Sequence, residues 1–295
     1  MTYFIAEICS NHLNDFDRCK KLIDKAKKIG CNAVKFQLFK ANQLFSEEIL
    51  KNSKPHRNIK KLELSKKLIP KLYSYTKKKK LDFGCTPFDI DSLRFLRNYV
   101  DFYKIGSYEL LRKDLFLECL KFKKKIIFST GMANEKEINT ILDIFKKKNF
   151  YNFSILRCVS SYPTNLKMIN LKSIETLKLF LKKKFKRKKI KVGWSDHSKN
   201  EGVVLKSIYK YNAEIIEFHL DLDGRGPEYK GGHCWLPNEF ERVIELEKQN
   251  KYFDGNGELS YQTVEKNERN WRSDPKDGLR PIRKERKKFI KQSNK

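Results

Sequence analysis

Several common features are missing from this sequence of 295 residues, and each absence excludes a class of protein. It has no run of 18 apolar residues, which excludes a transmembrane helix, so we expect no membrane partner. Residues 1–7 contain no basic stretch and already include an acid, Glu7, so we expect no secretory signal. CxxC pairs are also absent, and the seven cysteines stand singly. This pattern is typical of reduced thiols in the cytoplasm, where we expect the protein, and not of a disulfide framework.

Negative charge is scarce, because 65 lysines and arginines stand against 36 acids and give a formal net charge of +29. Much of the excess is lysine in short runs near the ends of helix-like segments, at 77–80, 123–125, 146–148 and 182–184. Helix C-termini favour cations, so we interpret these runs as solvated surface. A nucleic-acid groove is an alternative for so basic a chain, although we expect no nucleic-acid partner. An anionic small substrate would need only a few of the lysines.

Short apolar, β-branched or aromatic segments alternate along the chain with segments of helical spacing. The eight predicted strands are 3–8, 33–39, 81–86, 102–107, 125–130, 153–160, 190–195 and 214–220. Eight such units over about 250 residues predict an α/β fold, the closed (β/α)₈ TIM barrel. An open, doubly wound sheet is the alternative, but no GxGxxG motif follows the first strand.

The helical segments carry their own start and stop signals. From Phe16 to Ile29 the apolar residues fall on one helix face, and Asn14 or Asp15 is the predicted N-cap. A further helix is predicted over 62–75. The alternating pattern fades after about residue 250, so we expect a barrel over residues 1–250. Residues 251–295 are expected to form a short, polar, basic C-terminal arm and not a second globular domain.

Polar side chains gather where the predicted strands end, which is where the active sites of such barrels lie. They include Glu7, Lys35, Gln37, Thr86, Lys104, Ser107, Glu109, Ser129, Thr130, Arg157, Ser160, Ser161, Ser195, Asp196, His197, Glu217 and His219. Lys35 and Lys104 are informative, because a buried lysine is costly unless it is paired or partly hydrated. A register that places them outside the barrel is the alternative. With hydroxyls on other strands, they predict a cradle for phosphate and carboxylate groups.

Two histidines, His197 and His219, end the seventh and eighth predicted strands, which are neighbours in a barrel. Their imidazoles can hold one divalent ion, with carboxylate and water completing the shell. Glu7 and Glu228 are candidate oxygen ligands or acid–base groups. Residues 233–234, a histidine and a cysteine, follow closely, and we interpret them as loop contacts.

Motifs in order along residues 3–245 resemble the N-acetylneuraminate (sialic acid) synthase family. They are Ile5-Ala6-Glu7-Ile8, Asn11-His12, Ala33-Val34-Lys35-Phe36-Gln37, Thr86-Pro87-Phe88-Asp89, Lys104-Ile105-Gly106-Ser107, Ser129-Thr130-Gly131-Met132-Ala133, Ser160-Ser161-Tyr162-Pro163-Thr164, Val192-Gly193-Trp194-Ser195-Asp196-His197, Ile216-Glu217-Phe218-His219 and Gly226-Pro227. Each motif is weak alone, but the ordered set is specific. The family fold is a TIM barrel, in agreement with the repeat pattern.

The resemblance implies a metal-dependent condensation of phosphoenolpyruvate with an N-acetylated hexose, N-acetylmannosamine or a related sugar. The products would be a nonulosonic (sialic-type) acid and phosphate. It also implies a homodimer and Mn²⁺ on His197 and His219, with Mg²⁺ or Co²⁺ as alternatives. The expected catalytic carboxylates are Glu7, Glu109 and Glu228. The expected substrate-binding residues are Lys35, Gln37, Thr86, Lys104, Ser107, Ser129, Ser161, Tyr162 and Ser195.

Some features depart from the family pattern. Ser161 stands where the family usually has Asn, and Glu228 where it has Asp, which changes the reach of the carboxylate by one methylene. The antifreeze-like C-terminal domain of the family is not expected in this chain. Two alternatives therefore stay open: a 3-deoxy-sugar-phosphate synthase of the same superfamily, and a catalytically impaired barrel that acts as a binding component.

Overall fold

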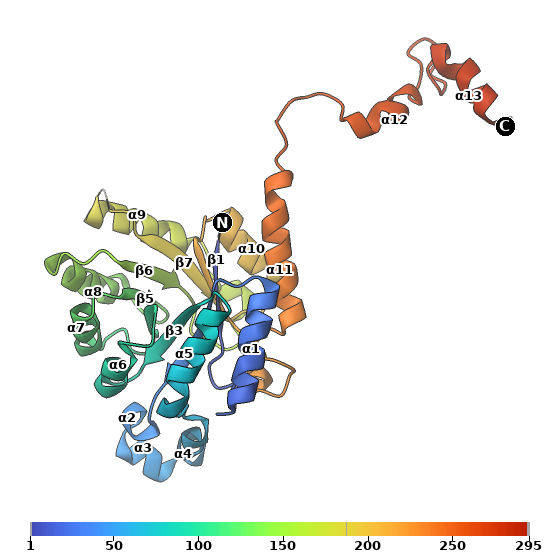
Figure 1. Cartoon of the computed structure of the whole chain (residues 1–295). Helices are drawn as coiled ribbons and strands as arrows, with labels where there is room; N and C mark the ends of the chain where they lie inside the picture. The colour runs from blue at the N-terminus through green and yellow to red at the C-terminus, as the bar shows by residue number, and fades with distance from the viewer. Residues whose placement is uncertain (1, 187, 294–295) are drawn as a thin grey trace. The chain divides into compact units, whose positions relative to one another are not determined.

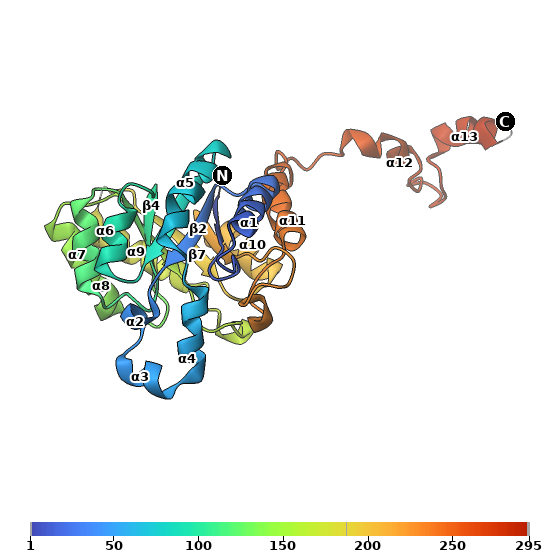
Figure 2. The ribbon, with the colours of Figure 1, turned by 60° about the horizontal axis from the view of Figure 1, so that its bottom comes forward.

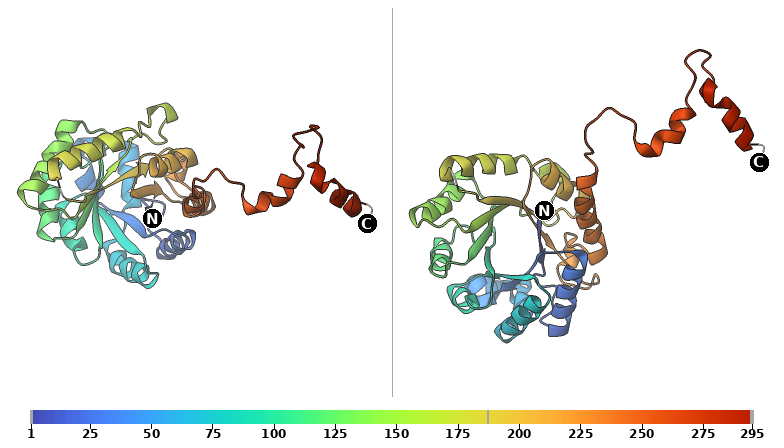
Figure 3. Two further views of the ribbon diagram at one scale, coloured as in Figure 1. Left: turned by 90° about the horizontal axis from the view of Figure 1, so that it is seen from above. Right: turned by 45° about the horizontal axis from the view of Figure 1, so that its top comes forward.

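The computed structural model describes residues 2–186 and 188–293 and divides into two compact units, Met1–Gln249 and Asn250–Lys295. In the first unit, eight parallel strands pair in sequence order and close into a barrel, with β8 beside β1 (Figure 1). The second view of Figure 3 looks into this ring of strands and shows helices around it. The predicted (β/α)₈ barrel is confirmed, and the open-sheet alternative is wrong.

All eight predicted strands are present, each within three residues of its predicted ends. They are β1 (Tyr3–Glu7), β2 (Ala33–Leu38), β3 (Asp82–Pro87), β4 (Phe102–Ile105), β5 (Lys125–Ser129), β6 (Phe153–Arg157), β7 (Lys191–Asp196) and β8 (Ile215–His219). The surrounding helices are α1 (Phe16–Ile29), α5 (Ile69–Lys78), α6 (Ile90–Leu96), α7 (Lys113–Lys121), α8 (Glu135–Lys147), α9 (Ser173–Phe185), α10 (Glu201–Tyr209) and α11 (Pro237–Gln249).

Strand alternation decides which side chains enter the barrel, because successive residues of a strand point to opposite faces. One buried apolar cluster lies inside: Ile5, Ala33, Phe102, Ile127, Leu156 and Ile215. Two residues further along these strands come Glu7, Lys35, Lys104, Ser129, Cys158 and Glu217, so they point inward as well. The barrel is therefore closed by apolar side chains below and is polar at the C-terminal ends of its strands.

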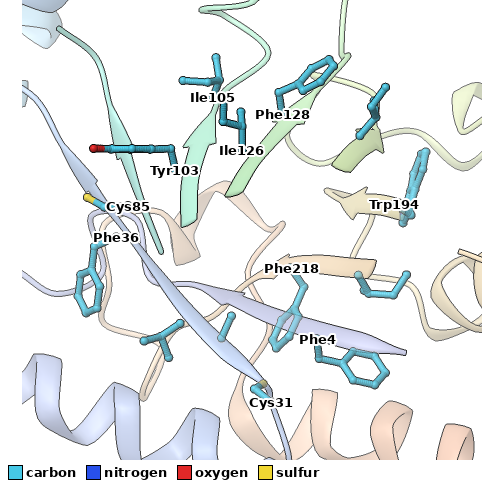
Figure 4. Packing of buried hydrophobic residues seen from close by; sticks show 14 of the residues in the cluster. Phe4, Cys31, Phe36, Cys85, Tyr103, Ile105, Ile126, Phe128, Trp194 and Phe218 are labelled. Carbon is cyan, nitrogen blue, oxygen red and sulfur yellow. The ribbon is translucent and has the colours of Figure 1, made fainter. Parts of the chain in front are cut away.

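Residues of the opposite parity pack between strands and helices. Figure 4 shows part of this layer, including Phe36, Tyr103, Phe128, Trp194 and Phe218. Inside the barrel, Gly84 of β3 leaves room for the ring of Phe102 on β4, since a Cβ at this glycine would collide with that ring. Packing on both faces explains why the strands are almost continuously apolar before their polar ends.

The first helix begins at the cap that we predicted, whereas the helix predicted over 62–75 begins later than expected. Asp15 caps α1, and its side chain accepts hydrogen bonds from the backbone N–H groups of Asp17 and Arg18. The helix predicted over 62–75 begins only at Ile69, because two short 3₁₀ turns and a break precede it. Between β2 and α5 the chain also forms three short helices that we did not predict, α2 (Ala41–Leu44), α3 (Glu47–Asn52) and α4 (Lys54–Asn58) (Figure 2).

The second unit has local structure of its own. It contains the short helices α12 (Lys266–Asn270) and α13 (Arg286–Ser293). Trp271 packs edge-on against Phe289 with 4.8 Å between ring centroids, and Asp277 pairs with Arg286 at 2.6 Å. The sequence predicted only an arm here, because helices this short carry no extended periodicity. Within residues 2–186 and 188–293, none of the helices is long and apolar enough to span a membrane.

Candidate active site

A cavity of about 740 Å³ opens at the C-terminal ends of the strands, a volume typical of small-molecule sites. It brings together every residue for which we predict a catalytic, substrate-binding or metal-binding role except Ser161. Of the other polar residues at strand ends, Glu217 lines it, whereas Thr130, Arg157, Ser160 and Asp196 do not. The predicted residues that line it are Glu7, Lys35, Gln37, Thr86, Lys104, Ser107, Glu109, Ser129, Tyr162, Ser195, His197, His219 and Glu228. They come from loops and strands across the chain, so closure of the barrel assembles the site.

Two buried lysines and two buried glutamates form the floor of the cavity. The Lys35 ammonium contacts the Glu7 carboxylate and lies 4.0 Å from Glu217, and Lys104 lies 3.5 Å from Glu217. Burial lowers the pKa of Lys35 to about 8, although Glu217 opposes this shift. Burial alone would raise the pKa of Glu217, but Lys104 and Lys35 outweigh it and hold that pKa below its ordinary value. The register that places the lysines outside the barrel is therefore wrong.

Each glutamate of the floor has an anchor besides the lysines. The Glu7 carboxylate accepts a hydrogen bond of 2.6 Å from the backbone N–H of Cys9. The Glu217 carboxylate accepts one of 3.0 Å from the Ser195 hydroxyl. Each of these contacts holds one oxygen of a carboxylate independently of the lysines.

Hydroxyl groups surround the lysines. Lys104 donates to Ser129 at 2.7 Å, and Lys35 donates to Thr86 at 3.1 Å. The Ser107 hydroxyl accepts from the backbone N–H of Gly131 at 2.9 Å, and a Cβ at this glycine would collide with Ser160. Ammonium and hydroxyl groups together suit an anion with several oxygens, and the phosphate and carboxylate cradle stays a prediction.

Glu109 is an acid of the cavity whose pKa is raised by burial. Its side chain is buried, and one carboxylate oxygen has no hydrogen-bond partner among the described residues. Burial raises the pKa of Glu109 to about 7, despite the opposing charge of Lys104. A carboxyl group with this pKa is half protonated near neutral pH and can exchange a proton there.

His197 and His219 face each other across the cavity wall, with 5.3 Å between ring centroids. The Nδ1 atom of His197 lies 2.7 Å from the Val159 carbonyl oxygen, and Nδ1 of His219 lies 3.0 Å from the Glu228 carboxylate. Both partners are acceptors, so both Nδ1 atoms carry the proton and leave lone pairs on Nε2. Burial lowers the pKa of His197 to about 3, so this ring is neutral. Imidazole nitrogens that are not engaged by another partner fit a divalent ion.

A second group of donors adjoins His219. One ligand atom from each of His219, Glu228, His233 and Cys234 lies within 4.8 Å of the others. The side chain of Tyr162 covers this region, and its ring centroid lies 4.3 Å from that of His197 and 5.0 Å from that of His233. Residues 233–234, which we interpret as loop contacts, lie at this position because the loop folds back over the end of β8, where the Trp235 backbone N–H donates to the His219 carbonyl.

The loop that carries Glu228 is held by residues from the start of the chain. Asn11 donates to the Leu220 carbonyl and accepts from the Glu228 backbone N–H. A Cβ at Gly226 would collide with Asn11, so the loop needs a glycine there. Arg18 of α1 pairs with the buried Asp221 at 2.9 Å, at the base of the same loop. The Asn11-His12 motif thus supports the site and does not line it.

Ser161 is a correction to the predicted substrate site. Its side chain is exposed, lines no part of the cavity, and donates to the Pro163 carbonyl at 3.3 Å. Conversely, the predicted roles omitted Glu217, His233 and Cys9. Glu217 had the same signal as Lys35, a charged residue at an inward position of an apolar strand. His233 and Cys9 lie in loops without periodicity, so no sequence signal pointed to them.

Comparison with known proteins supports the motif-based resemblance. The family model described as the NeuB family matches residues 22–258. N,N'-diacetyllegionaminic acid synthase of Campylobacter jejuni is 34% identical over 244 residues, 78% of this chain and 71% of that protein. The enzyme of the same name from Legionella pneumophila is 30% identical over 276 residues, 87% of this chain and 74% of that protein.

Among solved structures, N-acetylneuraminic acid (sialic acid) synthetase from Leptospira borgpetersenii, crystallised with citrate, superimposes with a TM-score of 0.76. It is 32% identical, and the match covers 90% of each chain. The named relatives are synthases of sialic-type acids. On the family match, the sequence identities and the shared barrel, this chain belongs to the NeuB family and is a synthase-type enzyme.

Proposed function

We propose that this chain condenses phosphoenolpyruvate with an N-acetylated hexose, N-acetylmannosamine or a related sugar, to give a nonulosonic (sialic-type) acid and phosphate. The observation that carries the proposal is the cavity itself, in which two buried ammonium groups lie among hydroxyls opposite a pair of histidines. Relatives named for legionaminic acid and pseudaminic acid synthesis support the product class.

The chemistry sets what the residues must do. C3 of phosphoenolpyruvate forms a bond to the aldehyde carbon of the open-chain sugar, and positive charge develops at C2. Water adds to C2, and the C2–O bond then breaks to release phosphate. The proton lost by that water balances the proton taken up by the new alkoxide. The site must therefore bind an anion, stabilise a cation and move protons.

The anion-binding role falls to the floor of the cavity. Lys35 and Lys104 would bind the phosphate and carboxylate of phosphoenolpyruvate, because ammonium–oxyanion hydrogen bonds are strong in a buried site. The hydroxyls of Thr86, Ser129 and Ser195 would complete the cradle, since they already contact the lysines or Glu217. Ser107 would add a further hydroxyl from the β4 loop.

The acids would act on the reacting carbons. Glu7, Glu109 and Glu228 would stabilise the charge at C2 and transfer protons. Glu109 suits proton transfer best, since burial brings its pKa to about 7. Gln37 and Tyr162 line the cavity, where they would contact the sugar.

A divalent ion belongs to this proposal, with His197 and His219 as its protein ligands. Mn²⁺ is the expected ion, with Mg²⁺ and Co²⁺ as alternatives. When bound, the ion supplies Lewis-acid polarisation of the aldehyde oxygen. The fit rests on the two rings, each of which turns Nδ1 toward an acceptor and so leaves Nε2 available for an ion. A homodimer remains part of the proposal, and light scattering on the purified protein would test it.

The test is phosphate release from phosphoenolpyruvate with Mn²⁺ across a panel of N-acetylated hexoses. We expect release with one sugar of the panel and its loss in His197→Ala. His56→Ala, which changes a histidine of α4 outside the cavity, is the matched control and should retain activity. A second panel of phosphorylated aldoses tests the 3-deoxy-sugar-phosphate alternative, and phosphate release only with this panel would favour it. Binding of phosphoenolpyruvate without turnover on any sugar would favour the impaired barrel.

A further inference from the structure

The donor cluster beside His219 contains a sulfur atom, which the proposed histidine pair does not use. Its members are His219 at the end of β8, Glu228 in the following loop, and the adjacent His233 and Cys234. Between the His219 Nδ1 atom and the nearer Glu228 oxygen the distance is 3.0 Å, and from that oxygen to His233 Nε2 it is 3.6 Å. Ligands bound to one small ion at about 2.0–2.3 Å stand at comparable separations.

Surrounding residues hold these donors in place, as outer contacts do in metal sites. The Cys9 thiol donates to one oxygen of Glu228, which leaves the other oxygen facing the histidines. Asn11 donates from its side-chain nitrogen to the Cys234 sulfur at 3.5 Å. Cys9 and Asn11 come from the loop after β1, so the cluster is held by a second segment of the chain.

The burial and hydrogen bonding of His233 give independent support for a ligand at this cluster. It is 6% exposed, and its Nδ1 atom has no hydrogen-bond partner among the described residues. Buried polar groups without partners are uncommon, and each one suggests a ligand or a functional constraint. The Nε2 atom of the same ring faces the Glu228 carboxylate at 3.6 Å, so His233 presents this nitrogen to the other donors of the cluster.

We propose that His219, Glu228, His233 and Cys234 form a divalent cation site with two nitrogen ligands, one oxygen and one sulfur. Imidazole and thiolate favour Zn²⁺ and Co²⁺, whereas Mn²⁺ and Mg²⁺ prefer oxygen ligands. Coordination of Cys234 releases its thiol proton to solvent, as metal binding to cysteine generally does. His219, Glu228 and His233 line the cavity, so an ion in this site is accessible from it.

An ion in this cluster prevents His219 from sharing an ion with His197. A neutral imidazole has one lone pair, and its protonated nitrogen cannot bind a metal. His219 faces Glu228 through Nδ1, so an ion in the cluster takes the lone pair at Nδ1 and moves the proton to Nε2. The ring is then unavailable for an ion shared with His197. The identity of the metal ion thus decides whether the four-residue cluster or the pair of His197 and His219 is occupied.

The inference rests on the proposed function only through the shared His219, and binding alone tests it. The metal-free full-length protein is titrated with Co²⁺, and the near-ultraviolet sulfur-to-cobalt charge-transfer band is recorded. We expect the band in the parent protein and in His197→Ala, and its loss in Cys234→Ser. Cys9→Ser is the matched control, because it removes a neighbouring buried thiol outside the donor cluster and should keep the band.

Further measurements with other metal ions and variants make the result decisive. Zn²⁺ should abolish the cobalt band at concentrations where Mn²⁺ leaves it intact. His233→Ala should weaken Co²⁺ binding while circular dichroism shows an intact fold. This second variant still tests the site if Cys234→Ser fails to fold. Co²⁺ binding without the band, or a band that persists in Cys234→Ser, overturns the site. Loss of the band in His197→Ala would also overturn it, because binding of the sulfur-ligated ion would then depend on His197, which is not one of the four proposed ligands. None of these results bears on phosphate release, which tests the proposed function separately.

Discussion

Buried ionisable residues set the pH range in which this site can work. Burial raises the pKa of Glu109 to about 7 and lowers the pKa of Lys35 to about 8. The carboxylate of Glu109 forms as pH rises through the first value, and the ammonium of Lys35 is lost as pH rises through the second. Both charges therefore coexist mainly between these two values, which should produce a narrow, bell-shaped profile.

We predict that kcat/KM for phosphoenolpyruvate rises through about pH 7 and falls above about pH 8. Glu109→Gln should remove the rising limb, because the amide does not titrate. Lys35→Arg should move the falling limb to higher pH, because guanidinium keeps its charge. Steady-state kinetics at several pH values measure both limbs. Glu135→Gln, an exposed change in α8, should keep the parent profile, and a rising limb retained in Glu109→Gln contradicts the assignment.

Lys104 allows a direct test of the oxyanion cradle. Lys104→Met removes an ammonium group that donates to Ser129 and lies 3.5 Å from Glu217. Because hydrogen bonds to charged groups contribute about 1.5–3 kcal/mol, we expect phosphoenolpyruvate affinity to fall by about 10- to 100-fold. Calorimetric titration of the folded variant measures this. Lys191→Met, an exposed lysine at the start of β7, should bind like the parent. Unchanged affinity in Lys104→Met would remove this lysine from the binding site.

At the level of single elements, packing inside the barrel is tight enough for one methyl group to matter. Gly84→Ala on β3 places a Cβ against the Phe102 ring of β4. Overpacking of this kind costs about 1–3 kcal/mol, so the urea midpoint of unfolding should fall. The double variant with Phe102→Leu should recover part of the loss, because the smaller side chain frees the space. A parent-like midpoint for Gly84→Ala would contradict the contact.

Helix ends account for the runs of lysine. Lys77 and Lys78 lie in the last turn of α5, Lys146 and Lys147 in that of α8, and residues 182–184 in that of α9. The helix macrodipole favours cations at these positions. The run at 123–125 lies instead between α7 and the start of β5. The two buried lysines of the cavity floor, Lys35 and Lys104, belong to none of these runs.

At the scale of the whole molecule, the cavity and the apolar core belong to the first unit. The last cavity residue is His233, and the last residue of the core cluster is Ile244. A chain of residues 1–252 should therefore fold, keep the melting temperature of the barrel, and bind phosphoenolpyruvate like the full chain. Circular dichroism and calorimetry measure these properties. Aggregation of the shortened chain, or loss of phosphoenolpyruvate binding, would show that the second unit supports the barrel.

Local patterning in the sequence was sufficient to predict the barrel and most of the residues that line its cavity. Strand side chains alternate with a period of two, so an apolar run that ends in Lys35, Lys104 or Ser129 shows which residues share a face. Because all the strands are parallel, their polar ends meet at one rim. For this reason the cavity contains every residue for which we predict a role except Ser161.

Tertiary structure decided what local patterning does not encode. The pairing of Lys104 on β4 with Glu217 on β8 depends on barrel closure, which brings β8 beside β1. Lys35 contacts Glu7 across the neighbouring strands β1 and β2, where the two residues are register partners. The outward turn of Ser161 and the position of residues 233–234 depend on loops, whose conformations follow from contacts such as that of Asn11 with Glu228. Loops have no periodicity, and protonation depends on burial, so both emerge only when distant segments pack together.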